Sequence, residues 1–147
     1  MKPDPTRLAR AIAYAERIGA GVLPELVLGG VGDAVVVTDA ELDAPGPIII
    51  FVNAAFERLS GYPRDELIGC SPRMLQGFDT DRAELVRMKA QLVAGECFEG
   101  AVLNYHKSGM EYVVGWAIAP VRARDAIRAW VSVQNDVMKD ARASRRG

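Results

Sequence analysis

The order of β-rich and helical stretches is the feature that most restricts how this chain can fold. Two β-rich stretches at residues 34–38 and 48–52 are followed by several short helical signals. Three further β-rich stretches then lie at residues 98–105, 111–119 and 127–134. Because the helical signals sit between two early strands and three late ones, we expect an α+β fold: a five-stranded antiparallel sheet that carries its helices on one face.

The short helical signals have identifiable starts. Asn53 can cap a first helix through Leu59, and residues 63–68 allow another turn. Ser71 and Pro72 are suited to the N-cap and first position of a third helix, since proline there loses no needed hydrogen bond. Pro72 is therefore explained by local structure alone.

A longer helix is expected to begin at Asp79 or Thr80 and to end at Gly95. Its apolar residues share one face and should pack on the sheet: Leu85, Met88 and Leu92.

The N-terminal segment reads as a helix with Asp4 as N-cap and Pro5 at the first position. Its apolar residues lie along one face: Leu8, Ile12, Ala15 and Ile18. Residues 25–28 allow one further turn, whose apolar side chains have no obvious place in a small core. We therefore expect residues 1–30 to form a helical cap or dimer surface, residues 31–138 the domain, and residues 139–147 a short basic tail.

Size and composition exclude several classes of protein. A chain of 147 residues, 50% of them apolar, fits one soluble domain. No apolar run approaches the roughly 20 residues of a transmembrane helix. A net charge of −1 gives no basic field for nucleic acid. Neither nucleic acid nor a membrane is an expected partner.

The cysteine and histidine counts argue against disulfides, metal sites and hydrolytic catalysis. Two cysteines without a secretory signal lead us to expect a reducing cytoplasm. The single histidine, His106, cannot form a zinc cluster of familiar spacing, and no pair of nucleophile and base can be named. We therefore do not expect an enzyme or a metal site.

A specific family resemblance rests on a motif and its context. The segments 53–56, 60–62 and 66–69, reading NAAF, SGY and ELIG, resemble the PAS family after its second strand. Residues 69–77, reading GCSPRMLQG, resemble the motif G-x-N-C-R-F-L-Q-G of light-oxygen-voltage (LOV) domains. Asp79-Thr80-Asp81 and the stretch LNYHKSG at 103–109 resemble later segments of the same domains. The resemblance covers about residues 34–137 and implies a PAS fold with FMN, or sometimes FAD, between sheet and helices.

Four flavin contacts of LOV domains are retained by this resemblance. Arg73 matches an arginine that pairs with the flavin phosphate, and Gln76 matches a polar contact to the ribityl chain. Asn104 and Gln134 match amides at the edge of the isoalloxazine ring, where a group that both donates and accepts is suitable.

Four other positions depart from the LOV pattern. Ser71 replaces the asparagine of the motif, Pro72 its photoactive cysteine, Lys89 a second phosphate arginine, and Val114 a second edge asparagine. Lysine keeps the charge but loses the bidentate fork of arginine, and valine cannot replace an amide. By strand alternation Trp116 and Tyr112 share a face with Val114, so an indole is expected where family members leave space for flavin.

The resemblance implies a sensory module without covalent photochemistry. Cys70 stands two positions before Pro72 and should point elsewhere. A bound flavin would then respond to light or to redox state by reduction, with Trp116, Trp130 or Tyr112 as possible electron donors and Gln134 as the transducer.

Two alternatives remain open at this stage: a PAS module that has lost its ligand and acts through dimerisation, and a redox sensor that binds flavin but needs no light. Taken singly, Arg73 and Lys89 read as solvated charges and the tryptophans as core. The expected partners are a second copy, through the N-terminal helix and the sheet, and an unidentified signalling protein.

Overall fold

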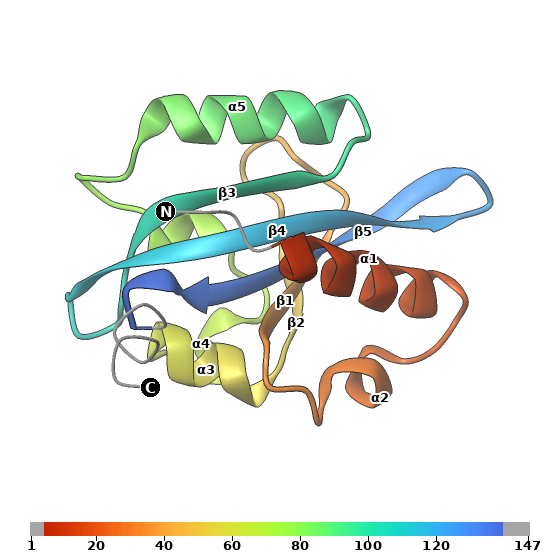
Figure 1. Cartoon of the computed structure of the whole chain (residues 1–147), viewed down its shortest axis with the longest axis horizontal. Coiled ribbons are helices and arrows are strands. Elements are labelled where there is room, and N and C mark those ends of the chain that lie inside the picture. Colours follow the sequence, from red (N-terminus) through yellow and green to blue (C-terminus); the bar gives the residue numbers. More distant parts are fainter. Residues whose placement is uncertain (1–4, 140–147) are drawn as a thin grey trace.

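A single antiparallel sheet organises the chain, with helices on both of its faces (Figure 1). The computed structural model describes residues 5–139. Within that range five strands are present, ordered β2-β1-β5-β4-β3 in space. They are β1 (Ala34–Asp39), β2 (Ile49–Val52), β3 (Phe98–Tyr105), β4 (Glu111–Ala123) and β5 (Ala126–Asp136). The predicted five-stranded antiparallel α+β fold is confirmed.

Strand β1 lies between β2 and β5. Its first four residues are all apolar, so both of its faces must be covered as well. Val35 and Val37 pack on the side of the N-terminal helices, which we call the outer face, and Val36 packs on the opposite, inner face. All three are at most 1% exposed.

The inner face carries α3 (Ala54–Ser60), α4 (Arg64–Leu67), the 3-10 helix η1 (Pro72–Leu75) and α5 (Arg82–Val93). Asn53 caps α3 as predicted, because its side chain accepts from the Phe56 N–H. The predicted start of α5 was wrong: Asp81, rather than Asp79 or Thr80, is its N-cap. The Thr80 hydroxyl is directed away from the helix, since it accepts from the Gly77 N–H at 2.9 Å and donates to the Leu103 carbonyl on β3 at 2.8 Å.

The outer face is covered by α1 (Pro5–Gly19), which lies across β4 and β5, and by α2 (Pro24–Leu28) (Figure 1). Ala11 and Ala15 of α1 are buried against the sheet. The expectation that the apolar residues of α2 have no place in the core was wrong, since Val27 and Leu28 are 3% and 0% exposed. The predicted Asp4 cap and residues 140–147 of the basic tail lie outside the described residues.

The last two strands are longer than predicted. They meet in a two-residue turn at Arg124 and Asp125, both with positive φ, which suits the twist of a hairpin. Pro120 is tolerated within β4 because the pairing with β3 does not extend past Ile118, leaving β4 with only one neighbouring strand there.

No helix within residues 5–139 combines the length and hydropathy of a membrane span.

A polar cluster fastens α1 to the start of β1. The Arg10 guanidinium donates to both Asp33 carboxylate oxygens, at 2.7 and 2.9 Å, and the Tyr14 hydroxyl donates to Asp33 at 2.8 Å. Burial raises the pKa of Asp33, but hydrogen bonds from Arg10 and Tyr14 outweigh it and bring the pKa below its usual value. Burial and the Asp33 hydrogen bond raise the pKa of Tyr14 to about 12.

Replacing Asp33 by asparagine should lower the free energy of unfolding at pH 7 by about 1–2 kcal/mol. Because the folded-state pKa lies below the unfolded one, this contribution is present above about pH 4 and is lost as the pH falls through the folded-state value. Urea unfolding of both proteins at pH 7 and pH 3 would show it. A difference of equal size at both pH values would contradict the assignment, and Asp65→Asn on the exposed surface of α4 serves as control.

Candidate functional site

A cavity of about 120 Å³ lies between the inner face of the sheet, η1 and α5. Its wall combines residues from β1, β4, β5, η1, α5 and the connection between β1 and β2. The lining residues are Val36, Thr38, Leu42, Pro47, Ser71, Pro72, Arg73, Gln76, Leu85, Met88, Lys89, Leu92, Trp116, Ile118, Trp130, Ser132 and Gln134. The lining is mostly apolar. Its cations are Arg73 and Lys89, and its amide side chains are those of Gln76 and Gln134.

Most of the residues selected from sequence meet at this cavity. The lining includes Ser71, Pro72, Arg73, Gln76, Lys89, Trp116 and Gln134. Asn104 and Val114 lie outside the lining, although both are buried, at 3% and 0% exposed. They stand on neighbouring strands farther along the sheet, where Asn104 pairs with Tyr112 and Val114 with Val102.

The Ser71-Pro72 pair builds the turn that presents Arg73. Ser71 is the N-cap of η1, and its hydroxyl accepts from the Arg73 N–H at 3.3 Å. Pro72 occupies the first helical position, where its fixed φ is favourable. The sequence therefore places a ring without a nucleophile at the cavity wall.

Two cations of the lining are engaged by the connection between β1 and β2. Arg73 donates from Nε to the Gly46 carbonyl at 2.9 Å and from Nη2 to the Leu42 carbonyl at 3.0 Å. Lys89 Nζ lies 2.8 Å from the Asp43 carboxylate. The hydrogen bond and charge of Lys89 hold the pKa of Asp43 below its usual value. Sequence reasoning missed these contacts, because no local pattern pairs an arginine with distant backbone carbonyls.

Several buried polar atoms of the cavity wall lack partners. Gln134 donates from Nε2 to the Ser132 hydroxyl at 3.1 Å, but its Oε1 has no hydrogen-bond partner among the described residues. The same holds for the indole N–H groups of Trp116 and Trp130. Most buried polar groups in proteins are paired, so these atoms favour a site that takes a hydrogen-bonding molecule.

Tyr112 lies on the inner face of β4, next to this cluster. Burial raises the pKa of its hydroxyl to about 12, although the Asn104 side chain opposes the shift. The phenol is therefore uncharged at neutral pH, and its hydroxyl is a further buried polar atom without a hydrogen-bond partner among the described residues.

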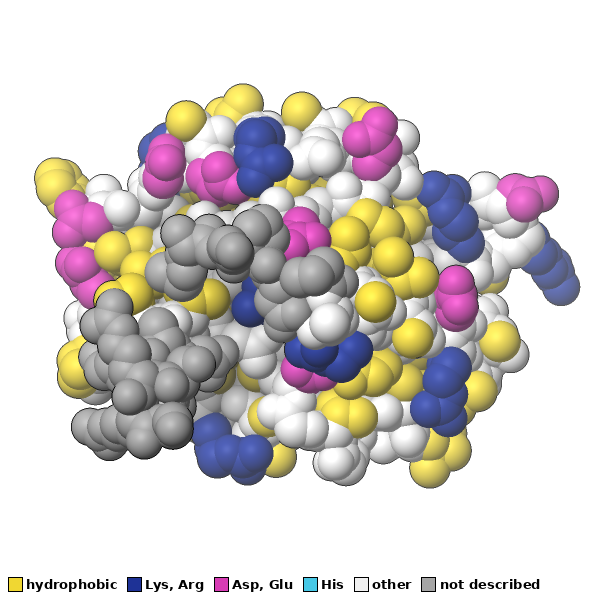
Figure 2. All heavy atoms as spheres, viewed as in Figure 1, with side chains coloured by type: hydrophobic (Ala, Val, Ile, Leu, Met, Phe, Trp, Pro, Cys, Tyr) yellow, Lys and Arg dark blue, Asp and Glu magenta, His cyan; other side chains and the backbone are white. Residues whose placement is uncertain are grey.

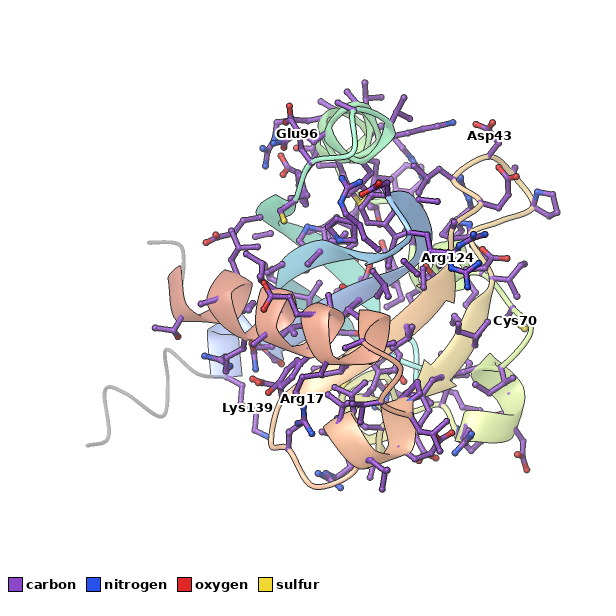
Figure 3. The ribbon with its side chains drawn as sticks, turned by 90° about the vertical axis from the view of Figure 1, so that its right-hand side faces the viewer. Arg17, Asp43, Cys70, Glu96, Arg124 and Lys139 are labelled. Carbon is purple, nitrogen blue, oxygen red and sulfur yellow. The ribbon has the colours of Figure 1, made fainter. Side chains whose placement is uncertain are left out.

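Neither cysteine lines the cavity. Cys70 is exposed, and its Sγ donates to the Glu66 carbonyl at 3.4 Å. Figure 3 shows it at the periphery, outside β1 and β2. Burial raises the pKa of Cys97, which packs on the outer-face cluster. Among residues 5–139 no group of three or more His, Cys, Asp or Glu side chains could hold a metal ion.

The side-chain chemistry fits a flavin, with cations for a phosphate, an amide for a ring edge and apolar surface for the rings. The volume is smaller than such a ligand needs, since ligand sites usually measure roughly 300–1,000 Å³ and a cavity of about 150 Å³ holds one benzene. A flavin therefore fits the donor set of this wall only after the wall opens.

Comparisons with known proteins agree with this architecture. Residues 32–139 match the PAS domain family. A blue-light photoreceptor of Listeria innocua is 34% identical over 116 residues, covering 79% of this chain and 44% of that protein. A blue-light-activated histidine kinase of Brucella ovis is 37% identical over 94 residues, covering 63% and 19%. The chain thus spans less than half of either curated relative.

Solved structures give the same result. The light-state structure of the blue-light photoreceptor Aureochrome1 LOV superposes with a TM-score of 0.68 at 29% identity, over 74% of this chain and 84% of that one. The LOV domain of a blue-light activated histidine kinase from Erythrobacter litoralis gives 0.67 at 28% identity, over 72% and 96%. The chain therefore belongs to the PAS domain family and, within it, to the LOV domains.

Proposed function

We propose that this chain is a sensory LOV module that holds FMN or FAD in the cavity beneath α5 and responds to light or redox state through flavin reduction. The observation that carries the proposal is one cavity that gathers Arg73, Gln76, Lys89 and Gln134 from separate parts of the chain. A bound flavin would supply blue-light absorption and a centre that accepts electrons.

The residues of the wall have distinct expected roles. Arg73 and Lys89 would neutralise a phosphate, and Gln76 would bind the chain that links phosphate to ring. Pro72 leaves no thiol at the cavity, so signalling would not use a cysteinyl bond. Trp116 and Trp130 would exclude water and are the candidate electron donors, because both indoles line the cavity.

Gln134 offers a route from the cavity to the outer face. Its neighbour Asn135 faces the other side of β5, where its side-chain Oδ1 accepts from Arg7 Nε of α1 at 2.8 Å. A rotation of the Gln134 amide would exchange its donor and acceptor and disturb the hydrogen bond to Ser132. Residues 134 and 135 thus connect the proposed flavin site to α1 through one strand.

The proposal is tested by absorption spectra of the purified protein incubated with FMN or FAD, in the dark and after blue light. Retained flavin whose visible band bleaches to the reduced form supports it. Absence of retained flavin from both incubations would refute it, and a reversible thiol-adduct spectrum would implicate Cys70 instead.

Gln134→Leu should remove most of the structural response to flavin reduction while leaving flavin binding within about threefold. Stability should fall by only about 1 kcal/mol, because the variant loses the hydrogen bond from Nε2 to Ser132 while Oε1 has no partner to lose. Amide NMR of Asn135 and α1, recorded before and after chemical reduction, measures the response. Ser132→Ala, which keeps the amide, is the control. An undiminished shift in the leucine variant would exclude Gln134 as transducer.

A second candidate is a ligand-free PAS module that acts through dimerisation and a signalling partner. The small volume of the cavity, about 120 Å³, favours it, since the space suits one ring rather than three. In that case Trp116 and Trp130 are simply core. The spectra described above separate the two functions, and light scattering would report the dimer.

A further inference from the structure

The connection between β1 and β2 forms a compact loop, which we call the strap (residues 40–47). Asp39 pins its base, because its carboxylate accepts from the Glu41 N–H at 3.2 Å and the Ile48 N–H at 2.9 Å. Within the strap, the Gly46 N–H donates to the Asp43 carbonyl at 2.8 Å. The loop is therefore held in shape in part by hydrogen bonds of its own.

The tip of the strap is held to the rest of the molecule by the two cavity cations. Arg73 reaches the carbonyls of Leu42 and Gly46, and Lys89 reaches the Asp43 carboxylate. The Asp43 and Lys89 side chains are 79% and 46% exposed. Exposed ion pairs contribute little to stability, so this attachment is weak enough for another anion to replace it. Figure 3 shows Asp43 at the outer end of the loop, close to α5.

The strap also forms part of the cavity wall. Leu42 and Pro47 belong to the cavity wall, and Leu42 packs against the cluster that contains Trp116. A movement that withdraws the strap would therefore do two things together. It would free the Arg73 fork and the Lys89 ammonium, and it would enlarge a space that now suits one ring.

We propose that the strap is an anion-displaced cover: a phosphate group takes the place of the Asp43 carboxylate on Lys89 and of the Leu42 and Gly46 carbonyls on Arg73, and the strap then leaves the cavity mouth. The identification of the physiological anion as a flavin phosphate rests on the proposed function. The exchange itself follows from the contacts, because the same N–H groups cannot serve the strap and a phosphate fully at once.

The strap makes the phosphate important for entry as well as for affinity. A flavin without a phosphate has no group to compete with Asp43, so it meets the closed cavity. A phosphorylated flavin releases the cover with the same interaction that anchors it. The site would therefore select FMN over riboflavin more strongly than one arginine and one lysine in an open groove.

The experiment is an amide NMR titration of residues 40–47 with inorganic phosphate at constant ionic strength, repeated with FMN and with riboflavin. Phosphate should give saturable shifts in the strap. Asp43→Asn should bind phosphate and FMN about two- to fivefold more tightly, as expected for loss of one exposed ion pair. The matched control is Asp65→Asn, which removes one exposed carboxylate from α4 and should leave both affinities unchanged.

The possible outcomes separate the strap from the flavin. If phosphate gave no saturable shifts in residues 40–47, the proposal that an anion displaces the strap would be wrong. The same conclusion would follow if Asp43→Asn and the wild type bound phosphate with equal affinity. Binding of FMN with the strap signals unmoved would overturn it too, while leaving the proposed function intact. If phosphate displaced the strap but the protein bound no flavin, the result would support displacement by an anion and refute the proposed flavin site.

Discussion

A chain that lacks residues 1–30 should fail to form a stable monomer. Ala11, Ala15, Val27 and Leu28 are each at most 3% exposed and pack against the outer face of the sheet. Full burial of a valine or leucine is worth about 1.5–3 kcal/mol, while an entire domain is stable by only about 5–15 kcal/mol. Circular dichroism and thermal unfolding should show a large loss of stability, and light scattering should show association.

If residues 1–30 were only a dimer surface, as the sequence allows, the deletion would simply turn a dimer into a monomer. The apolar face of α1 is used within the same chain, so its removal uncovers Ala117, Val131 and Val133 rather than only a docking surface. A soluble, monomeric deletion variant with unchanged thermal stability would show that the outer face does not need α1 and α2.

Point variants separate loss of packing from loss of chain length. Ala15→Glu places a carboxylate where the side chain is 3% exposed and should destabilise strongly, since a buried charge without a partner is costly. Glu16→Gln, one position along the same helix and exposed, should have little effect. Equal behaviour of the two variants would argue against the packing of α1 on the sheet.

A dimer interface on the outer face would have few exposed apolar side chains of α1 and α2 available to it. Ile12, Leu23 and Leu26 are 36%, 61% and 72% exposed. On the face that Figure 2 shows, lysine and arginine side chains are interspersed with acidic ones rather than gathered in a basic patch. A dimer through α1 would therefore use residues beside, and not within, the packed face.

The fold was largely predictable because its signals are local. Strand alternation placed Val114 and Trp116 on one face, and the structure has both in the inner-face cluster. The cap of α5 was not predictable, because Asp79, Thr80 and Asp81 are all good caps. The choice depends on where the Thr80 hydroxyl lies in the folded chain, where it accepts from the Gly77 N–H and donates to a carbonyl of β3.

The sequence predicted part of the cavity lining, but it also selected Asn104 and Val114, which lie outside it, and it did not predict the contacts that the cations make. The family resemblance assigned Arg73 and Gln134 to one flavin pocket, and both residues line the cavity. The strap contacts depend on how a Pro- and Gly-containing loop packs against η1 and α5, and no periodicity encodes this. Asn104 illustrates the same limit, because it is buried on β3 opposite Tyr112 and lies outside the cavity lining.

Trp116→Leu should lower the free energy of unfolding and raise the affinity for FMN. It tests whether the indole occupies the space that the flavin rings would need. Trp116 is 6% exposed, lines the cavity and meets Phe98 edge to face, with ring centroids 5.9 Å apart. Shortening it should cost about 2–4 kcal/mol of unfolding free energy. The loss is limited because its indole N–H has no partner to forfeit.

The same substitution should raise the affinity for FMN by about tenfold or more, because binding no longer has to displace an indole from the space for the rings. Phe98→Leu is the matched control: Phe98 is 1% exposed in the same cluster but does not line the cavity, so it should lose comparable stability without gaining affinity. Equilibrium dialysis with FMN and urea unfolding of both variants measure the two quantities. If Trp116→Leu is destabilised as expected yet binds FMN no better than Phe98→Leu, the indole does not occupy the flavin space, and the strap alone limits entry.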